Sequence, residues 1–213
     1  EANPLGVMSS YNDWDGQPIT GSYFFLTELL RKKFGFKGYV VSDSDAVEFI
    51  FTKHHIAKDS ADAVRIALES GLNVRTNFQI PETYILPARK LVKEGKLKMS
   101  IIDSRVADVL GVKFKLGLFD QPFVQNPAAA DSIVYNNDAK KFSSQISKEA
   151  LVLLKNEGSL LPLDKSKFKN ILVTGPLAAD TLTSMSRYGP SNVKVVSVLE
   201  GLQNYDPKNV QVK

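Results

Sequence analysis

Apolar and polar positions along the first 119 residues follow a pattern that predicts strands, each followed by an amphipathic helix. Short apolar runs of strand character occupy residues 7–11, 38–42 and 72–76. After each run, apolar residues recur at helical spacing until a glycine ends the stretch. The helices are predicted over residues 22–34, over 62–69 after short turns near Val47, and around 84–92, and the closing glycines are Gly35, Gly71 and Gly95. This repetition is typical of right-handed βα units on a parallel sheet.

The pattern changes in the second half of the chain. One more helix is predicted from Ser100, which resembles the start of a capping box with Asp103, to Gly117. A linker rich in Pro, Gln, Asn and Ala follows, and then a long helix over 137–156 and a strand over 170–174. We therefore predict three parts: βα units over 1–119, a linker with a connecting helix over 120–159, and the start of a second α/β domain over 160–213.

The predicted elements are too few to complete either domain. Three βα units cannot close a barrel, which needs about eight. The roughly 50 residues from 160 onward are too few to cover both faces of a sheet. In addition, the opening strand begins almost at the first residue, without the layout of a signal peptide. We expect the chain to be part of a longer protein.

Composition excludes several classes of function. The chain of 213 residues is 43% hydrophobic and 23% charged, which is the balance of a globular protein with a core. Its net charge is +4, but the lysines are interleaved with acidic residues, so no nucleic-acid partner is expected. The absence of cysteine excludes disulfides, a thiol nucleophile and Cys-based zinc sites. No apolar run approaches the length of about 20 residues that a membrane span needs.

Polar side chains follow each of the three predicted strands, where parallel α/β proteins place their functional residues. The three strand ends carry Tyr11-Asn12-Asp13, Asp43-Ser44-Asp45 and Arg75-Thr76-Asn77. Asp43 directly follows a rigid apolar run, which suits a catalytic carboxylate, although a strand-end ion pair fits the same position. Asp45 fits a helix N-cap. Asp43 and Asp45 together also fit the Asp-x-Asp pattern of Mg-dependent phosphotransferases, so this pattern leaves the chemistry open.

The remaining candidates are weaker. His54 and His55 are adjacent and lack the i, i+4 spacing of a metal site, so a structural role is favoured. Met8 alternates with Val7 on a strand and is expected in the core. Tyr11 and Trp14, near a strand end, suit a core lid or a sugar-stacking face equally.

Three segments, in order along the chain, resemble glycoside hydrolase family 3. They are residues 7–12 (VMSSYN), 35–43 (GFKGYVVSD) and 153–163 (LLKNEGSLLPL). Residues 113–119 (KFKLGLF) also look like the end of the first domain of that family, and residues 171–180 like the first strand and turn of the second. The resemblance implies an α/β fold: the C-terminal part of a (β/α)8-like barrel, a linker helix and the start of an α/β sandwich domain.

The resemblance also implies an activity and site residues. Asp43 matches the nucleophile of a retaining, exo-acting β-glycosidase, which forms a covalent glycosyl-Asp intermediate. Tyr11 matches a tyrosine beside that nucleophile, and Met8 matches a methionine that borders the pocket for the terminal sugar. The acid/base carboxylate comes from the second domain, beyond this chain, so the isolated chain is expected to be inactive. The substrate is an oligosaccharide or β-glycoside, with β-glucosidase activity favoured and β-xylosidase activity next.

Further implications concern cofactors, assembly and specificity. No metal or cofactor is required, a homodimer is compatible with the family, and a periplasmic or secreted location is favoured. Many β-glucosidases of the family carry Trp directly after the nucleophile, whereas Ser44 occupies that position here. Arg75-Thr76-Asn77 departs from the acidic or Met-containing ending common at that strand, so the sequence does not predict its contacts.

Overall fold

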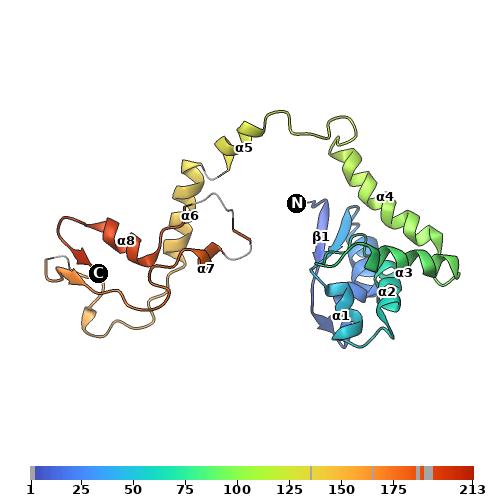
Figure 1. Ribbon diagram of the computed structural model, residues 1–213, viewed down its shortest axis with the longest axis horizontal. Coiled ribbons are helices and arrows are strands. Elements are labelled where there is room, and N and C mark those ends of the chain that lie inside the picture. Colours follow the sequence, from blue (N-terminus) through green and yellow to red (C-terminus); the bar gives the residue numbers. More distant parts are fainter. Residues whose placement is uncertain (1–2, 135, 165, 186–187, 190–193) are drawn as a thin grey trace. The chain divides into compact units, whose positions relative to one another are not determined.

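The computed structural model describes residues 3–134, 136–164, 166–185, 188–189 and 194–213 (Figure 1). It divides into two compact units, Glu1–Ala130 and Asp131–Lys213. The first unit contains β1 (Gly6–Ser9), β2 (Asp13–Trp14), β3 (Gln17–Pro18), η1 (Ile19–Gly21), η2 (Phe24–Lys33), β4 (Tyr39–Ser42), α1 (Ala46–Thr52), α2 (Ser60–Ser70), α3 (Glu82–Lys93) and α4 (Met99–Lys115). Helix α5 (Pro127–Ile133) follows α4. The architecture is α/β, because helices connect parallel strands.

A small parallel sheet organises the first unit. Strands β1 and β4 pair in parallel, with Met8 opposite Val41 and Ser9 opposite Ser42. The third predicted strand is reduced to one parallel bridge, between Val41 and Val74. Ser42 N nevertheless donates to Val74 O at 2.8 Å, so all three segments run side by side in the same direction.

The core of this unit lies between β4 and the helices around it, η2 before the strand and α1 and α2 after it. Its buried members are apolar residues from η2, β4, α1, α2 and their connections: Leu26, Val40, Val47, Ile50, Ala57, Ala63, Ala67 and Leu72. A second cluster joins α2 to α3 and the turn before α4 through Val64, Leu68, Leu91 and Leu97. Burial of these side chains, at about 1.5–3 kcal/mol for each large one, holds α1 and α2 against β4.

Several local features differ from the sequence expectations. The polar loop after the first strand contains a hairpin, β2–β3, whose two turn residues Asp15 and Gly16 have φ of 50° and 75°. An Asp-Gly pair favours this turn because both positions need positive φ. The predicted capping box at Ser100 is wrong, because α4 begins at Met99 after Lys98, which makes no side-chain cap. Helix α2 is instead capped by Asp59, whose side chain accepts from Asp62 N.

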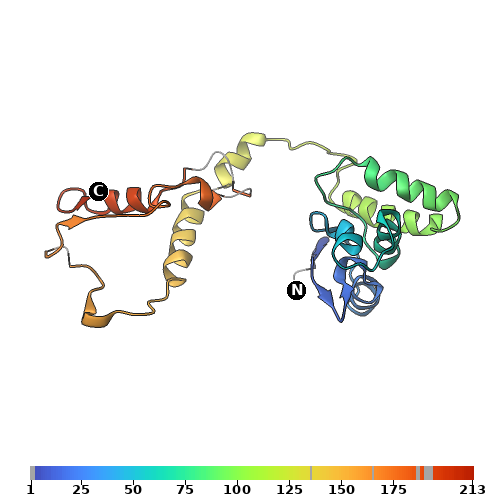
Figure 2. The ribbon, with the colours of Figure 1, turned by 60° about the horizontal axis from the view of Figure 1, so that its bottom comes forward.

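The second unit contains α6 (Asn137–Glu149), η3 (Glu157–Ser159), β5 (Asn170–Ile171), α7 (Leu182–Met185), α8 (Val198–Tyr205) and β6 (Gln211–Val212). Helix α6 is shorter than the predicted 137–156, and β5 is shorter than 170–174. Strands β5 and β6 pair in parallel, with Ile171 opposite Val212, and α8 packs against β6 (Figure 2). The crossover from β5 to β6 is therefore a second α/β element. Among the described residues, no helix combines the length and apolar character of a membrane span.

Candidate active site

The three strand ends meet at one edge of the sheet in the first unit. Asp43 follows β4 directly, and Tyr11 lies two residues after β1. The segment after Val74 is fixed to the end of β4 by two hydrogen bonds, Thr76 N to Ser42 Oγ and Asp45 N to Thr76 O, both 2.9 Å. Parallel pairing thus places Tyr11, Asp43 and the Arg75–Asn77 segment on the same side of the sheet, where side chains from several strands can act together.

The Asp43 carboxylate is partly exposed and locally held. Its Oδ1 accepts a hydrogen bond from Ser44 N at 2.7 Å, and its backbone oxygen accepts from Ala46 N at 3.1 Å. The first contact fixes one carboxylate oxygen against the backbone. Such local anchoring limits the rotamers of the side chain, which favours a fixed direction for a reacting oxygen.

Asp45 does not act as a helix cap. It occupies the residue before α1, but its φ is 60° and its side chain makes no capping hydrogen bond. The N-cap interpretation is therefore wrong, because an N-cap requires an extended backbone that turns the side chain toward the first amides of the helix. Its Oδ1 is buried without a hydrogen-bond partner among the described residues.

Tyr11 joins the site through its ring and its backbone. The ring lies 5.4 Å from that of Phe49 on α1, measured between centroids. His54 Nε2 donates to Tyr11 O at 3.1 Å, and His54 Nδ1 lies 3.8 Å from Asp13 Oδ2. His54 thus holds the loop after β1 to the loop after α1, which agrees with a structural role. The described residues contain no group of three His, Asp or Glu side chains arranged to hold a metal ion.

A cavity of about 410 Å³ opens at the strand ends; Ser44 and Asp45 line it, whereas Asp43 itself is not among the lining residues. It is lined by residues from all three strand ends and from α1: Tyr11, Ser44, Asp45, Phe49, Lys53, His54 and Phe78. Aromatic rings beside a few polar groups are typical of pockets for small organic ligands. Met8 is not among the lining residues, and at 62% exposure it does not belong to the core as its alternation predicted.

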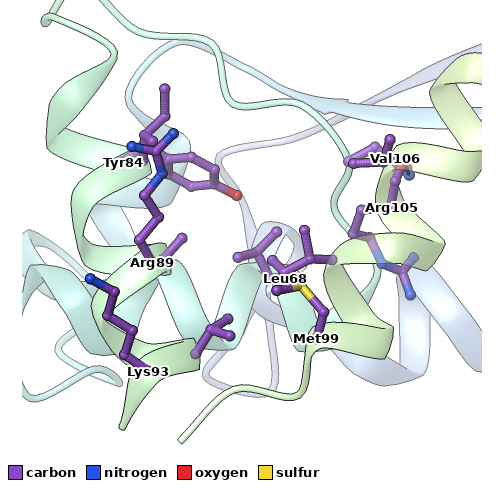
Figure 3. A pocket seen from close by; sticks show the side chains of 12 residues that line it. Leu68, Tyr84, Arg89, Lys93, Met99, Arg105 and Val106 are labelled. Carbon is purple, nitrogen blue, oxygen red and sulfur yellow. Dashed lines mark hydrogen bonds between the residues drawn. The ribbon is translucent and has the colours of Figure 1, made fainter. Parts of the chain in front are cut away.

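A second cavity, of about 500 Å³, lies between α3 and α4 (Figure 3). Helix α3 contributes Tyr84, Arg89 and Lys93 to its lining (Figure 3). Helix α4 contributes Met99, Arg105 and Val106. Its lining contains no Asp or Glu.

Sequence reasoning missed several residues at the strand ends. Phe49 and Lys53 come from α1 and the residue after it, and Phe78 follows the third strand segment. Glu48, also on α1, binds both Arg75 and Asn77. The one available signal was the position of Glu48 in the otherwise apolar stretch Ala46-Val47-Glu48-Phe49-Ile50, which packs against the core.

Comparison with known proteins places the chain among glycosidases. The family model described as the glycosyl hydrolase family 3 N terminal domain matches residues 1–112, and the C-terminal domain model of the same family matches residues 151–211. A periplasmic β-glucosidase of Salmonella typhimurium is 37% identical over 96% of this chain, and a putative β-xylosidase of Formosa agariphila is 36% identical over 87%.

Solved structures agree with these matches. A β-glucosidase from Erythrobacter marinus superposes with a TM-score of 0.82 over 100% of the chain at 35% identity. A GH3 exo-β-xylosidase in complex with a xylobiose aziridine probe gives a TM-score of 0.78 at 28% identity. The chain spans about a quarter of these proteins: 27% and 24% of the two relatives, and 28% and 27% of the two solved chains. Since the first family model alone covers more than half of the residues, the chain belongs to glycosyl hydrolase family 3.

Proposed function

We propose that the protein is a retaining, exo-acting β-glycosidase and that Asp43 is its nucleophile. The observation that carries this proposal is the position of Asp43 at the carboxyl end of β4, beside the Tyr11 strand end and directly before Ser44, which lines the cavity of about 410 Å³. Family membership supports the reaction class, and the names of the relatives support a substrate with a terminal β-linked glucose or xylose.

In this mechanism Asp43 must be ionised and aimed at the anomeric carbon. The hydrogen bond from Ser44 N to Asp43 Oδ1 restricts the rotamers of this side chain and so fixes its direction. A carboxylate oxygen attacks the anomeric carbon, the bond to the leaving group breaks, and a covalent glycosyl-Asp43 forms. Water then attacks the same carbon from the opposite side and restores the original anomeric configuration.

The reaction needs a second carboxyl group about 5 Å from the first, which protonates the leaving group and later activates the water. By resemblance to the family this group comes from the second domain, beyond the residues of this chain. The isolated chain is therefore proposed to be inactive. The same resemblance supports a (β/α)8-like barrel that contains β1 and β4 and a sandwich domain that contains β5 and β6.

Two features bear on the sugar and the leaving group. Ser44 lines the cavity where a tryptophan would present a broad flat wall, so this side of the cavity is open to substituents of different size. Phe49 and Phe78 supply aromatic faces on which a sugar or aryl group can stack. We propose β-glucoside substrates first and β-xylosides second, because both activities occur in the names of similar proteins.

Covalent trapping tests this function directly. A 2-deoxy-2-fluoro-β-glucoside with a dinitrophenyl leaving group is incubated with the full-length protein, and the labelled peptide is identified by mass spectrometry. The fluorine slows the second step, so the intermediate accumulates, and we expect the label on Asp43. The corresponding xyloside ranks the two sugars by their rates of labelling. A label on another carboxylate, with Asp43 unmodified, refutes the assignment.

A further inference from the structure

The strand end next to that of Asp43 is fixed by a single carboxylate oxygen. Glu48 Oε1 accepts hydrogen bonds from Arg75 Nη1 at 2.9 Å and from Asn77 Nδ2 at 2.8 Å. Glu48 lies on α1, whereas Arg75 and Asn77 lie on the segment that follows the Val41–Val74 bridge. One oxygen therefore joins the helix that follows Asp43 to the neighbouring strand end.

The charges in this contact are shielded from water. The Arg75 side chain is 6% exposed and the Glu48 side chain 20%. Arg75 Nη1 also donates to Thr83 Oγ1 at 2.9 Å, and its guanidinium lies 5.1 Å from the centre of the Tyr84 ring. Because Arg75 is packed on α3 as well, it cannot follow Glu48 if that side chain moves.

The geometry extends from this contact to Asp43. Thr76 lies between the two donors, and its carbonyl oxygen accepts from Asp45 N while its amide donates to Ser42 Oγ. These two hydrogen bonds bracket Asp43 on both sides along the chain. When Arg75 and Asn77 are held by Glu48, Thr76 is held between them, and the backbone on either side of Asp43 is fixed in turn.

We infer that Glu48 is a positioning residue for the nucleophile: through Arg75, Asn77 and Thr76 it fixes the direction of the Asp43 carboxylate. This inference rests on the proposed function of Asp43. Misplacement of a reacting group by about 1 Å costs on the order of a hundredfold in rate.

Three variants separate positioning from charge and from general stability. Glu48→Ala removes the shared acceptor, and we expect fluoro-sugar labelling of Asp43 to slow by about 10- to 100-fold, with a fall in kcat rather than a rise in KM. Glu48→Gln keeps one acceptor oxygen at the Oε1 position, and labelling is expected within about threefold of the wild-type rate. Asn77→Asp keeps the shape but turns a donor toward Glu48 into an acceptor, and is expected to resemble Glu48→Ala.

Glu69→Ala on α2 is the matched control, because Glu69 also pairs with an arginine but lies outside the strand ends. We expect it to label at the wild-type rate. Equal rates for Glu48→Ala and Glu69→Ala would overturn the inference, and so would a Glu48→Gln variant as slow as Glu48→Ala, because charge rather than geometry would then be responsible.

Hydrogen exchange provides a readout that does not depend on activity. In Glu48→Ala the amides of Asp45 and Thr76 are expected to exchange at least about tenfold faster, while amides in the middle of α2 keep their protection. If the wild-type protein takes no label at Asp43, the proposed function fails, and the exchange rates still decide whether Glu48 anchors this backbone. Unchanged protection at Asp45 and Thr76 refutes the anchoring in either case.

Discussion

Asn73 Oδ1 lies 2.7 Å from Arg31 Nη2, and the same oxygen accepts from Val40 N at 2.7 Å. The Asn73 Nδ2 group donates to Arg105 O and to Asp108 Oδ2, both at 2.9 Å. One side chain thus connects η2, β4 and α4 at the beginning of the third strand segment. This contact lies at the opposite end of that segment from Arg75–Asn77 and sets where the strand starts.

Replacement of Asn73 by alanine is therefore expected to destabilise the first unit. Val40 is fully buried, and its amide would lose its acceptor, while Arg31 and Asp108 would each lose a neutral partner. We expect the free energy of unfolding to fall by about 3 kcal/mol. Urea unfolding followed by far-UV circular dichroism measures this change. Gln79→Ala, in an exposed loop position of the same unit, should change it by less than about 0.5 kcal/mol.

A second prediction concerns the start of β4, where glycine is required by space. A Cβ atom at Gly38 would run into the backbone oxygen of Leu5, which accepts from Tyr39 N. Gly38→Ala should destabilise the protein by about 3 kcal/mol, because β1 and β4 would have to separate. Gly111→Ala in α4 is the matched control. A Cβ there meets no atom within 4 Å, so alanine should be neutral or stabilise the helix by up to about 1 kcal/mol. Equal effects of the two changes would contradict the packing argument.

The alternation of strands and helices was predictable from the sequence because local periodicity determines it. Residues 38–42 are an apolar run between a glycine turn and a polar segment, and β4 occupies 39–42. Gly35 and Gly71 end their helices with φ of 70° and 124°, as the need for positive φ predicts. The helix after Gly21 is a π-helix over Phe24–Lys33, a distinction that apolar spacing does not predict.

The contacts among the strand ends were not predictable, because they join residues far apart in the chain. The bond between Glu48 and Asn77 spans 29 residues, and that between Arg31 and Asn73 spans 42. No periodic pattern encodes which charged side chain meets which amide. The left-handed conformation of Asp45 was not predictable either, because Asp is favoured both at N-caps and in left-handed positions. In the structure, Asp45 N donates to the distant Thr76 O, and its φ is 60°.

A third prediction follows from the carboxyl of Asp62 on α2. Burial raises its pKa, but hydrogen bonds from the Arg65 side chain and from Lys58 N lower it by more, so the pKa lies below its ordinary value. A depressed pKa means that ionised Asp62 stabilises the fold at pH values above its unfolded pKa of about 4, and that this contribution disappears as the pH falls below it. Asp62→Asn should therefore cost up to about 1 kcal/mol at pH 7 and progressively less below pH about 4.

The pH dependence can be assigned to the ion pair by removing its partner. Arg65 Nε and Nη2 donate to Asp62 Oδ1 at 2.9 and 2.7 Å. In an Arg65→Ala background, Asp62→Asn should have a smaller effect at pH 7 and a weaker pH dependence. A difference between wild type and Asp62→Asn that grows as the pH falls from 5 to 3 would contradict the sign of the shift.

The last prediction addresses Asp43 and Asp45 together. Asp43→Gly in the full-length protein should lower hydrolysis of a dinitrophenyl β-glycoside by at least about a thousandfold, because the first displacement loses its nucleophile. Asp45→Gly should cost much less, since Asp45 already has a φ of 60°, which glycine adopts readily, and its role in the glycosidase reaction is not nucleophilic. A phosphotransferase with an Asp-x-Asp pair would instead release phosphate, lose activity with EDTA and depend on both carboxylates.

Azide makes this experiment specific to a retaining mechanism. A small anion can occupy the space left by the Asp43 carboxylate and attack the anomeric carbon from the side on which that carboxylate lay, opposite the leaving group. Dinitrophenolate leaves without needing a proton. The carbon–nitrogen bond forms as the carbon–oxygen bond breaks, and one displacement replaces two, so the product is a glycosyl azide of inverted, α configuration. We expect azide to restore turnover of Asp43→Gly and to leave Asp45→Gly unaffected, with the product configuration read by proton NMR. A glycosyl azide of β configuration, or restored turnover of Asp45→Gly alone, would show that Asp43 is not the nucleophile.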